Sequence, residues 1–144
     1  MMTEKMTRQR VAEIIAAADA RGERPSLAYA NLTNLDLTAL NMTGANLQGA
    51  DLRYTKMDYA NLNGAKLCHA DLRGAKLTGT NLTAADLTGA TLAMSDLDSA
   101  GLHGANLADA DLYRANLGGA DMTGANLTGA HLRYANLSGT ILDS

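Results

Sequence analysis

Leucine recurs every five residues along most of this chain, and the residues between the leucines follow a fixed order. Positions 32, 37, 42 and every fifth residue to 142 are Leu or, at three of them, Met. A small residue, most often Ala, stands two places before each of these positions, and a frequent Gly stands two places after it. The residues between are mostly Asp, Asn, Thr, Arg or Lys. The order continues without an insertion, so the chain is an internal repeat.

A five-residue period indicates that these residues form neither a continuous α-helix nor a long β-strand. On an α-helix, neighbours lie three and four residues apart, and a long strand alternates every two residues. The small residue and the Leu are two apart, so they share one side of a short extended segment. The next two residues must turn the chain, and Gly suits a corner that needs positive φ. A chain that turns the same way after every unit is predicted to form a solenoid with Leu and Ala inside.

The first 25 residues follow a different pattern. Residues 8–20 are predicted to form a helix that Thr7 caps and that Gly22 and Pro25 end. Its apolar stripe consists of Val11, Ile14, Ile15 and Ala18. We expect this helix to cover the first coil, where the bulky Leu35 and Leu40 replace Ala, because a solenoid end exposes unpaired backbone and apolar side chains. The alternative is a helix that docks on a partner.

Units such as Ala50-Asp51-Leu52-Arg53-Tyr54 and Ala125-Asn126-Leu127-Thr128-Gly129 match the motif A(D/N)LXX. In this the chain resembles the pentapeptide-repeat family. The resemblance implies an all-β solenoid, a right-handed quadrilateral β-helix with four pentapeptides per coil and just under six coils. The predicted division is an N-terminal capping helix and linker at residues 1–25 and the β-helix at residues 26–144. At about 4.8 Å per coil, the array would be roughly 28 Å long.

Four units per coil would stack residues 20 apart on one face. One such face collects basic and aromatic side chains, which are enriched where proteins contact each other. We predict a protein-contact face made of Arg53, Tyr54, Arg73, Tyr113, Arg114, Arg133 and Tyr134. The alternative is a solvated ladder of Asp–Arg pairs with tyrosines covering their neighbours.

The C-terminal end has no predicted cap. Ile141 replaces a residue that is polar in most units, and with Leu142 it would leave an apolar end with unpaired backbone groups. We expect a homodimer that stacks end to end, as the resemblance also implies. The alternative is a monomer protected by Asp143, Ser144 and fraying.

No residue pattern indicates catalysis. Cys68 and His69 lack a second pair of metal ligands and an orienting base, and His103 and His131 are isolated on the surface. Inward hydroxyls are expected to bond backbone carbonyls rather than act as nucleophiles; they belong to Thr55, Thr80, Ser95 and Thr140. There is no phosphate loop and no nucleotide fingerprint. We therefore expect no catalytic residue, no cofactor, no metal and no enzyme.

Composition narrows the class of function. A chain of 144 residues with one Cys, no signal peptide and no apolar run of membrane length is expected to be one cytoplasmic domain. Residues 26–144 hold 11 Asp and 7 Lys or Arg, a net charge of −4. This acidity argues against nucleic-acid binding.

Three functions remain open at this stage. The leading prediction is a non-catalytic rigid scaffold that binds an unidentified protein partner. The resemblance also implies a second function, a DNA mimic that regulates or protects a type II topoisomerase, DNA gyrase. Duplex DNA of about 28 Å would carry about 16 charges, so the charge disfavours it. The third is a purely structural spacer.

Overall fold

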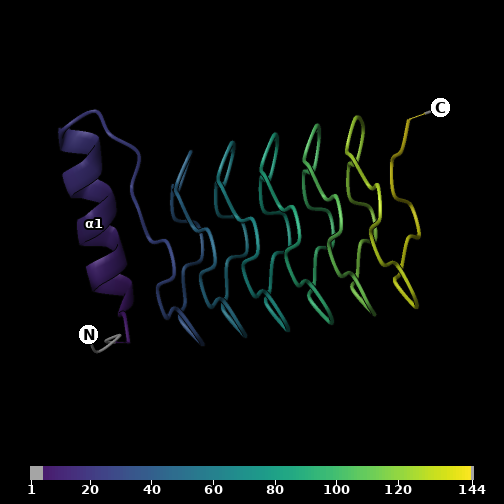
Figure 1. Ribbon diagram of the computed structural model, residues 1–144, viewed down its shortest axis with the longest axis horizontal. Coiled ribbons are helices and arrows are strands. Elements are labelled where there is room, and N and C mark those ends of the chain that lie inside the picture. The colour runs from purple at the N-terminus through teal and green to yellow at the C-terminus, as the bar shows by residue number, and fades with distance from the viewer. Residues whose placement is uncertain (1–4, 144) are drawn as a thin grey trace.

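The computed structural model describes residues 5–143, which form a stack of coils with one α-helix, α1 (Arg8–Ala20), beside the first coil (Figure 1). Parallel bridges join each residue before a central Leu to the residue 20 positions later, from Ser26↔Asn46 to Asp121↔Ile141. Twenty residues are four five-residue units, so each coil has four sides. The N-terminus and the C-terminus lie at opposite ends of the stack.

The pairing between coils takes place at single residues. All the bridges are isolated, and residues 5–143 contain no continuous strand. Around Leu47, for example, the Asn46 N–H donates to the Pro25 carbonyl of the previous coil at 2.9 Å, and the Leu47 N–H donates to the Lys66 carbonyl of the next coil at 2.7 Å. The Ala50 N–H turns back to the Leu47 carbonyl at 3.1 Å and closes the corner. Each unit is therefore bonded to the coils on both sides.

The core is a column of central Leu and Met side chains lined by Ala. From Leu27 to Met122 the central residues are almost completely buried, and so are most of the Ala residues two places before them. The predicted inward hydroxyls are confirmed as donors to backbone carbonyls: Thr55 to Leu52 at 2.8 Å, Thr80 to Met57 at 2.7 Å, Ser95 to Leu92 at 2.6 Å and Thr140 to Leu117 at 2.9 Å. A buried hydroxyl is thus accommodated without an unpaired donor.

The preference for Asp or Asn before the central Leu has a local cause. In most units the side-chain Oδ1 of this residue accepts the backbone N–H two residues later. Asn41 accepts from Thr43 at 3.2 Å, and Asp86 accepts from Thr88 at 3.0 Å. This turn satisfies an amide that the bridges leave free, which is the reason that short carboxylate and amide side chains suit the position.

The solenoid begins one unit earlier than the regular motif indicates. Leu27 is 2% exposed, Tyr29 has the corner conformation with φ 60°, and Ser26 is bridged to Asn46. The motif hides this unit because Pro25 takes the place of the usual Ala.

Helix α1 is fastened to the first coil by packing and hydrogen bonds. The Thr7 hydroxyl accepts the Arg10 N–H at 3.1 Å and caps the helix as predicted. Val11 is fully buried in the core cluster, with Ile14 and Ile15 packed against that cluster. The Arg8 guanidinium donates to the carbonyls of Asp36 at 2.7 Å and Thr38 at 3.1 Å. Leu35 and Leu40 also pack against the core cluster.

Every corner of the solenoid requires a left-handed backbone. The residue two after each central residue has positive φ throughout, from Tyr29 to Gly139. Gly accepts this conformation without strain, but twelve corners carry other residues, among them Tyr54 with φ 59° and Arg114 with φ 55°. Each non-Gly corner costs about 1–2 kcal/mol.

Aromatic rings cover several glycine corners. A Cβ added to Gly79 would lie 2.7 Å from ring atoms of Tyr59, which occupies the same corner one coil earlier. The same arrangement joins three more pairs: Tyr29 with Gly49, Tyr54 with Gly74, and His69 with Gly89. The glycine is therefore needed for both its φ and the space that its missing side chain leaves.

Gly79→Ala should destabilise the protein more than Gly64→Ala. Both corners have similar φ, +62° and +66°, but nothing lies within 4 Å of a Cβ at Gly64. Gly64→Ala should cost about 1 kcal/mol of backbone strain, and Gly79→Ala about 1 kcal/mol more because the Tyr59 ring must move. Urea unfolding of both variants measures the difference, and equal losses would contradict the role of the ring.

Candidate functional site

Residues 20 apart do stack on the face predicted for protein contact. The bridges Asp51↔Asp71, Asp71↔Thr91, Thr91↔Asp111 and Asp111↔His131 place the corresponding units of successive coils side by side. We call this the Arg–Tyr face; it comprises residues 51–54, 71–74, 91–94, 111–114 and 131–134. The structure brings the seven predicted contact residues onto one face, but it divides them into two groups.

In the first group, the arginines are neutralised by carboxylates. The Arg53 Nη2 lies 2.7 Å from the Asp51 Oδ2, and the Arg73 Nη2 lies 2.6 Å from the Asp71 Oδ2. The Arg53 Nε also lies 3.8 Å from the Asp71 Oδ2, which links the two coils. Here the geometry is the Asp–Arg ladder of the alternative interpretation. Tyr54 lies on the neighbouring corner, over Gly74.

These ion pairs shift the acidity of both carboxyl groups. The hydrogen bonds from the Arg53 side chain lower the pKa of Asp51. Burial acts to raise the pKa of Asp71, but the hydrogen bonds from Arg73 outweigh burial and lower it. Both carboxylates therefore stay ionised and occupied by arginine down to acidic pH.

A unit without charged side chains separates the two groups on this face. Its unit on this face is Thr91-Leu92-Ala93-Met94, in which Ala93 is buried and Met94 is exposed.

In the second group, two arginines and two tyrosines alternate in a block of four, which we call the Arg–Tyr cluster: Tyr113, Arg114, Arg133 and Tyr134. The two tyrosine rings meet edge to face with centroids 5.8 Å apart. The Arg114 Cζ lies 5.3 Å from the Tyr113 centroid and 5.7 Å from the Tyr134 centroid, and the Arg133 Cζ lies 4.9 Å from the Tyr134 centroid. These are cation–π distances. Within residues 5–143, neither arginine forms a salt bridge.

The order of residues explains why only this group keeps its charge. In the first group an Asp stands two residues before each Arg, so the two side chains meet. His131 takes that place before Arg133, and Tyr113 stands two residues after Asp111, which moves Arg114 to the corner. The sequence shows which residue stands two positions before each Arg, but only the structure shows that these two side chains meet in the same turn.

The C-terminal coil is open at its outer side. Leu137, Ile141 and Leu142 are 41%, 55% and 53% exposed, although Leu117 and Met122, the counterparts of Leu137 and Leu142 one coil earlier, are buried. Within residues 5–143, the amides of Leu127, Leu132 and Leu137 have no backbone acceptor. The Asp143 carboxylate accepts the Gly124 N–H at 2.9 Å. Ser144, named in the monomer alternative, lies outside the described residues.

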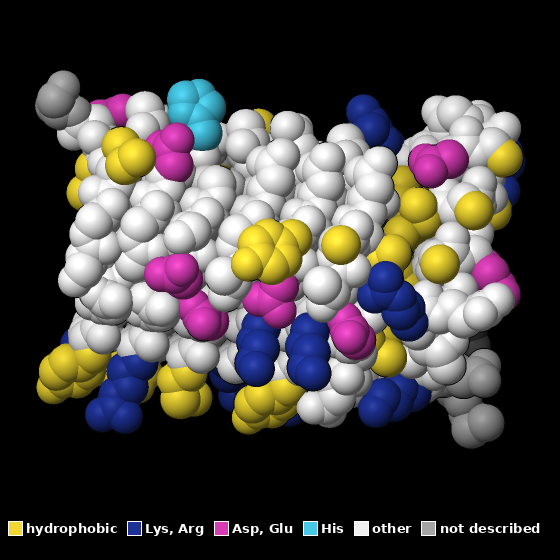
Figure 2. Space-filling view, turned by 180° about the vertical axis from the view of Figure 1, so that it is seen from behind, with side chains coloured by type: hydrophobic (Ala, Val, Ile, Leu, Met, Phe, Trp, Pro, Cys, Tyr) yellow, Lys and Arg dark blue, Asp and Glu magenta, His cyan; other side chains and the backbone are white. Residues whose placement is uncertain are grey.

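One charged column was not singled out from the sequence. The bridges place Asp36, Lys56, Lys76 and Asp96 in a row along another face. Figure 2 shows basic side chains next to acidic ones midway along the coils on that side of the molecule. The spacing of 20 residues could have revealed this column, but only after the number of units per coil was fixed.

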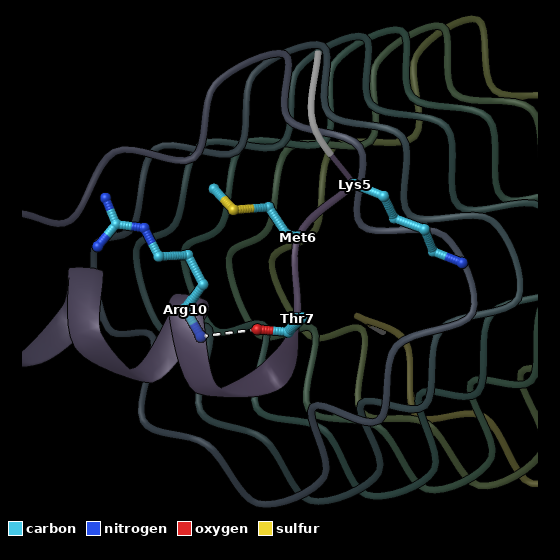
Figure 3. Close-up of a pocket in the computed structure, with 4 residues that line it drawn as sticks. All are labelled: Lys5, Met6, Thr7 and Arg10. Carbon is cyan, nitrogen blue, oxygen red and sulfur yellow. Dashed lines mark hydrogen bonds between the residues drawn. The ribbon is translucent and has the colours of Figure 1, made fainter. Parts of the chain in front are cut away.

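A hollow lies at the start of α1, away from the Arg–Tyr face. Lys5, Met6, Thr7 and Arg10 line it, and the Thr7 hydroxyl is already bonded to the Arg10 amide (Figure 3). Among the described residues, this lining holds two cations and no carboxylate. His69 lies against Gly89, and residues 5–143 contain no cluster of three potential metal ligands.

Comparison with known families agrees with this geometry. The sequence profile described as Pentapeptide repeats (8 copies) matches three segments of the chain, residues 30–67, 67–104 and 105–143. The chain belongs to the pentapeptide repeat family. No curated protein is similar enough in sequence to count as a match. In the part of this family member that the structure describes, no helix is both long and apolar enough to cross a membrane.

Solved structures of other family members are similar to this chain. The pentapeptide repeat protein Rfr23 of the cyanobacterium Cyanothece 51142 is 30% identical with a TM-score of 0.76, over 78% of this chain and 91% of that one. A pentapeptide repeat protein of the Arabidopsis thaliana thylakoid lumen is 34% identical with a TM-score of 0.53, over 61% and 65%. QnrB1, a plasmid-mediated fluoroquinolone resistance protein, is 20% identical with a TM-score of 0.62, over 85% and 67%. At this identity, QnrB1 shows a shared fold.

Asp51→Asn/Asp71→Asn should be less stable than the wild type only when the carboxylates are ionised. Both pKa values are lowered from the ordinary 3.8, so the ion pairs stabilise the fold above pH 3.8, and this contribution is lost as pH falls through the folded-state pKa values. Asn keeps the Oδ1 acceptor and removes the charge. We expect a loss of less than about 1 kcal/mol at neutral pH, measured by urea unfolding, because the pairs are solvated.

The same measurement at about pH 2 is the control for the charge. There the difference in stability between the variant and the wild type should be smaller than at neutral pH, and a difference of unchanged size would show that the ion pairs are not its source.

Proposed function

We propose that this pentapeptide repeat protein is a non-catalytic rigid scaffold that binds a protein partner through the Arg–Tyr face. The scaffold is a right-handed quadrilateral rod of about six coils once the unit around Leu27 is counted, with α1 as its N-terminal cap. The observation that carries the proposal is the Arg–Tyr cluster, in which two arginines that pair with no carboxylate among residues 5–143 are held on two tyrosines at the surface. Aromatic and Arg side chains are the commonest anchors of protein interfaces.

The backbone supports the scaffold role. Each coil is bonded to its neighbours at all four sides with N···O distances near 2.7–3.0 Å, and no loop interrupts the register. Such a rod holds side chains on neighbouring coils at fixed spacing, which lowers the entropy lost on binding. The Leu and Ala core fills the interior of the rod, so the surface is where a partner would bind.

A purely structural spacer would need no particular side chains on its faces. The Arg–Tyr cluster disfavours this alternative, because its tyrosines and arginines sit partly on strained corners. Arg114 and Tyr134 have φ 55° and 61°, where Gly would cost less. Residues that are retained against backbone strain cluster at functional sites.

A DNA mimic that acts on gyrase is a weaker alternative. The likeness to QnrB1 concerns the fold, and the net charge of −4 over residues 26–144 falls far below the roughly 16 charges of duplex DNA of equal length. The unpaired arginines of the Arg–Tyr cluster would also repel a site that binds phosphates.

Replacing three of the four arginines of this face should strongly reduce recovery of a partner. We expect the triple variant Arg73→Gln/Arg114→Gln/Arg133→Gln to lose most of the protein that the wild type retains in a pull-down quantified by mass spectrometry. The matched control is Lys56→Gln/Lys66→Gln/Lys76→Gln, which removes the same charge from the other faces. Circular dichroism would verify that both variants are folded.

Two results would count against the proposed contact face. Equal recovery by the two variants would place the contact elsewhere, and no protein retained by the wild type would favour the spacer.

We also propose that the open C-terminal coil forms a homodimer. A two-fold axis would place the apolar Leu137, Ile141 and Leu142 of two copies against each other and remove them from water. Each end offers free N–H groups at the central residues and free carbonyls at the small residues before them, so the end is complementary to a copy of itself.

Ile141→Arg/Leu142→Arg should convert the dimer into a monomer, because two buried, unpaired charges per subunit would oppose stacking. Light scattering of the purified protein measures the mass directly. Met94→Arg is the control, since Met94 is similarly exposed, at 56%, but lies on a side of the rod. It should leave the mass unchanged, whereas a monomeric wild type at micromolar concentration would rule out the dimer.

A further inference from the structure

We propose that the Arg–Tyr cluster is a clamp for a short acidic segment of the protein partner, whose carboxylates pair with Arg114 and Arg133. This inference rests on the proposed function and narrows it. It confines the binding site to the C-terminal part of the Arg–Tyr face and states the chemistry of the segment that binds there.

The charge of the cluster is the first reason. Arg53 and Arg73 have their carboxylates at 2.7 and 2.6 Å, so a partner would have to displace Asp51 and Asp71 to reach them. Arg114 and Arg133 form no such pair within residues 5–143. Arg133 donates one hydrogen bond, to the Tyr134 hydroxyl at 3.2 Å, and the Arg114 side chain donates none to the described residues. The remaining guanidinium donors are free for a ligand.

The second reason is that the two guanidinium groups are held in place. Tyr134 contacts both of them, and Tyr113 adds a second ring beside Arg114. Bridged coils carry all four side chains, and coils in such a stack are about 4.8 Å apart. Arginine side chains that are already held in place lose less conformational entropy when a carboxylate binds them in the bidentate geometry that guanidinium favours.

The surroundings favour a short acidic segment over a nucleic acid. The cluster provides two unpaired cations, whereas a duplex carries one charge per about 1.7 Å. Further along the same face a long polyanion would meet Asp51 and Asp71. A segment with a few carboxylates can pair with the cluster and avoid these repulsions.

His131→Asp tests the clamp without removing either arginine. It restores the Asp that stands two residues before Arg in the first group, so the introduced carboxylate should occupy Arg133 as Asp71 occupies Arg73. The control is Asn126→Asp, which adds the same charge to the same coil on another face. Arg114→Gln/Arg133→Gln is a second variant that removes the clamp directly and does not depend on how position 131 packs.

The probe is a fluorescein-labelled peptide of alternating Glu and Gly, with Gln–Gly and Lys–Gly peptides and a single-stranded DNA oligonucleotide of equal charge for comparison. Fluorescence anisotropy should show that the Glu peptide binds the wild type more tightly than the others and that rising salt weakens this binding. His131→Asp and Arg114→Gln/Arg133→Gln should each weaken it by roughly tenfold or more, and Asn126→Asp by less than about twofold.

The peptide-binding and pull-down experiments distinguish an error in the acidic clamp from an error in the proposed scaffold function. No binding of the Glu peptide to the wild type, equal weakening by Asn126→Asp, or tighter binding of the oligonucleotide would each overturn the acidic clamp. If the pull-down still retains a partner whose recovery is unaffected by His131→Asp, the scaffold stands and the clamp is wrong. If the pull-down retains nothing while the peptide binds, the clamp stands and its cellular role is wrong.

Discussion

The structure depends on one register: within the solenoid, each coil places its residues beside those 20 positions further along the chain. This register pairs the amides of one coil with the carbonyls of the next and stacks Leu upon Leu along the axis. Neither the backbone pairing nor the Leu core could hold a single unit together, because the core is only as wide as a few side chains and each bridge contains a single residue. Their repetition over the rod makes a stable structure from units that could not fold separately.

The same register divides the residues into those that build the rod and those that are free to vary. The central Leu, the small residue before it and the corner conformation serve the fold. The residues on either side of the Leu point outward and serve the fold only through short turns such as Asn41 with Thr43. The corner residues serve both purposes. Gly fits the backbone conformation best, whereas Tyr, His or Arg at a corner adds a functional side chain to the surface and strains the backbone.

How much of this the sequence predicts depends on the range of each interaction. The period, the inward Leu and Ala, the bonds of Thr80 and Ser95, and the cap at Thr7 depend on neighbours within a unit or on a strict repeat, so the pattern predicts them. Leu27 was missed because Pro25 obscures its unit. The contact face was predicted as one surface, but pairing splits it, because Asp71 meets Arg73 while His131 leaves Arg133 unpaired. The rings over Gly49 and Gly79 need the spacing of whole coils to be recognised.

The square cross-section also limits how such a chain can change length. Adding one pentapeptide preserves the local motif but turns every later residue by a quarter of the circumference, so Arg133 would move away from the side that carries Tyr113. Adding a whole coil of twenty residues keeps every later side chain on its original side and only lengthens the rod. Tandem duplication can therefore extend this protein without disturbing its surfaces only in steps of four units, although the core would accept any number.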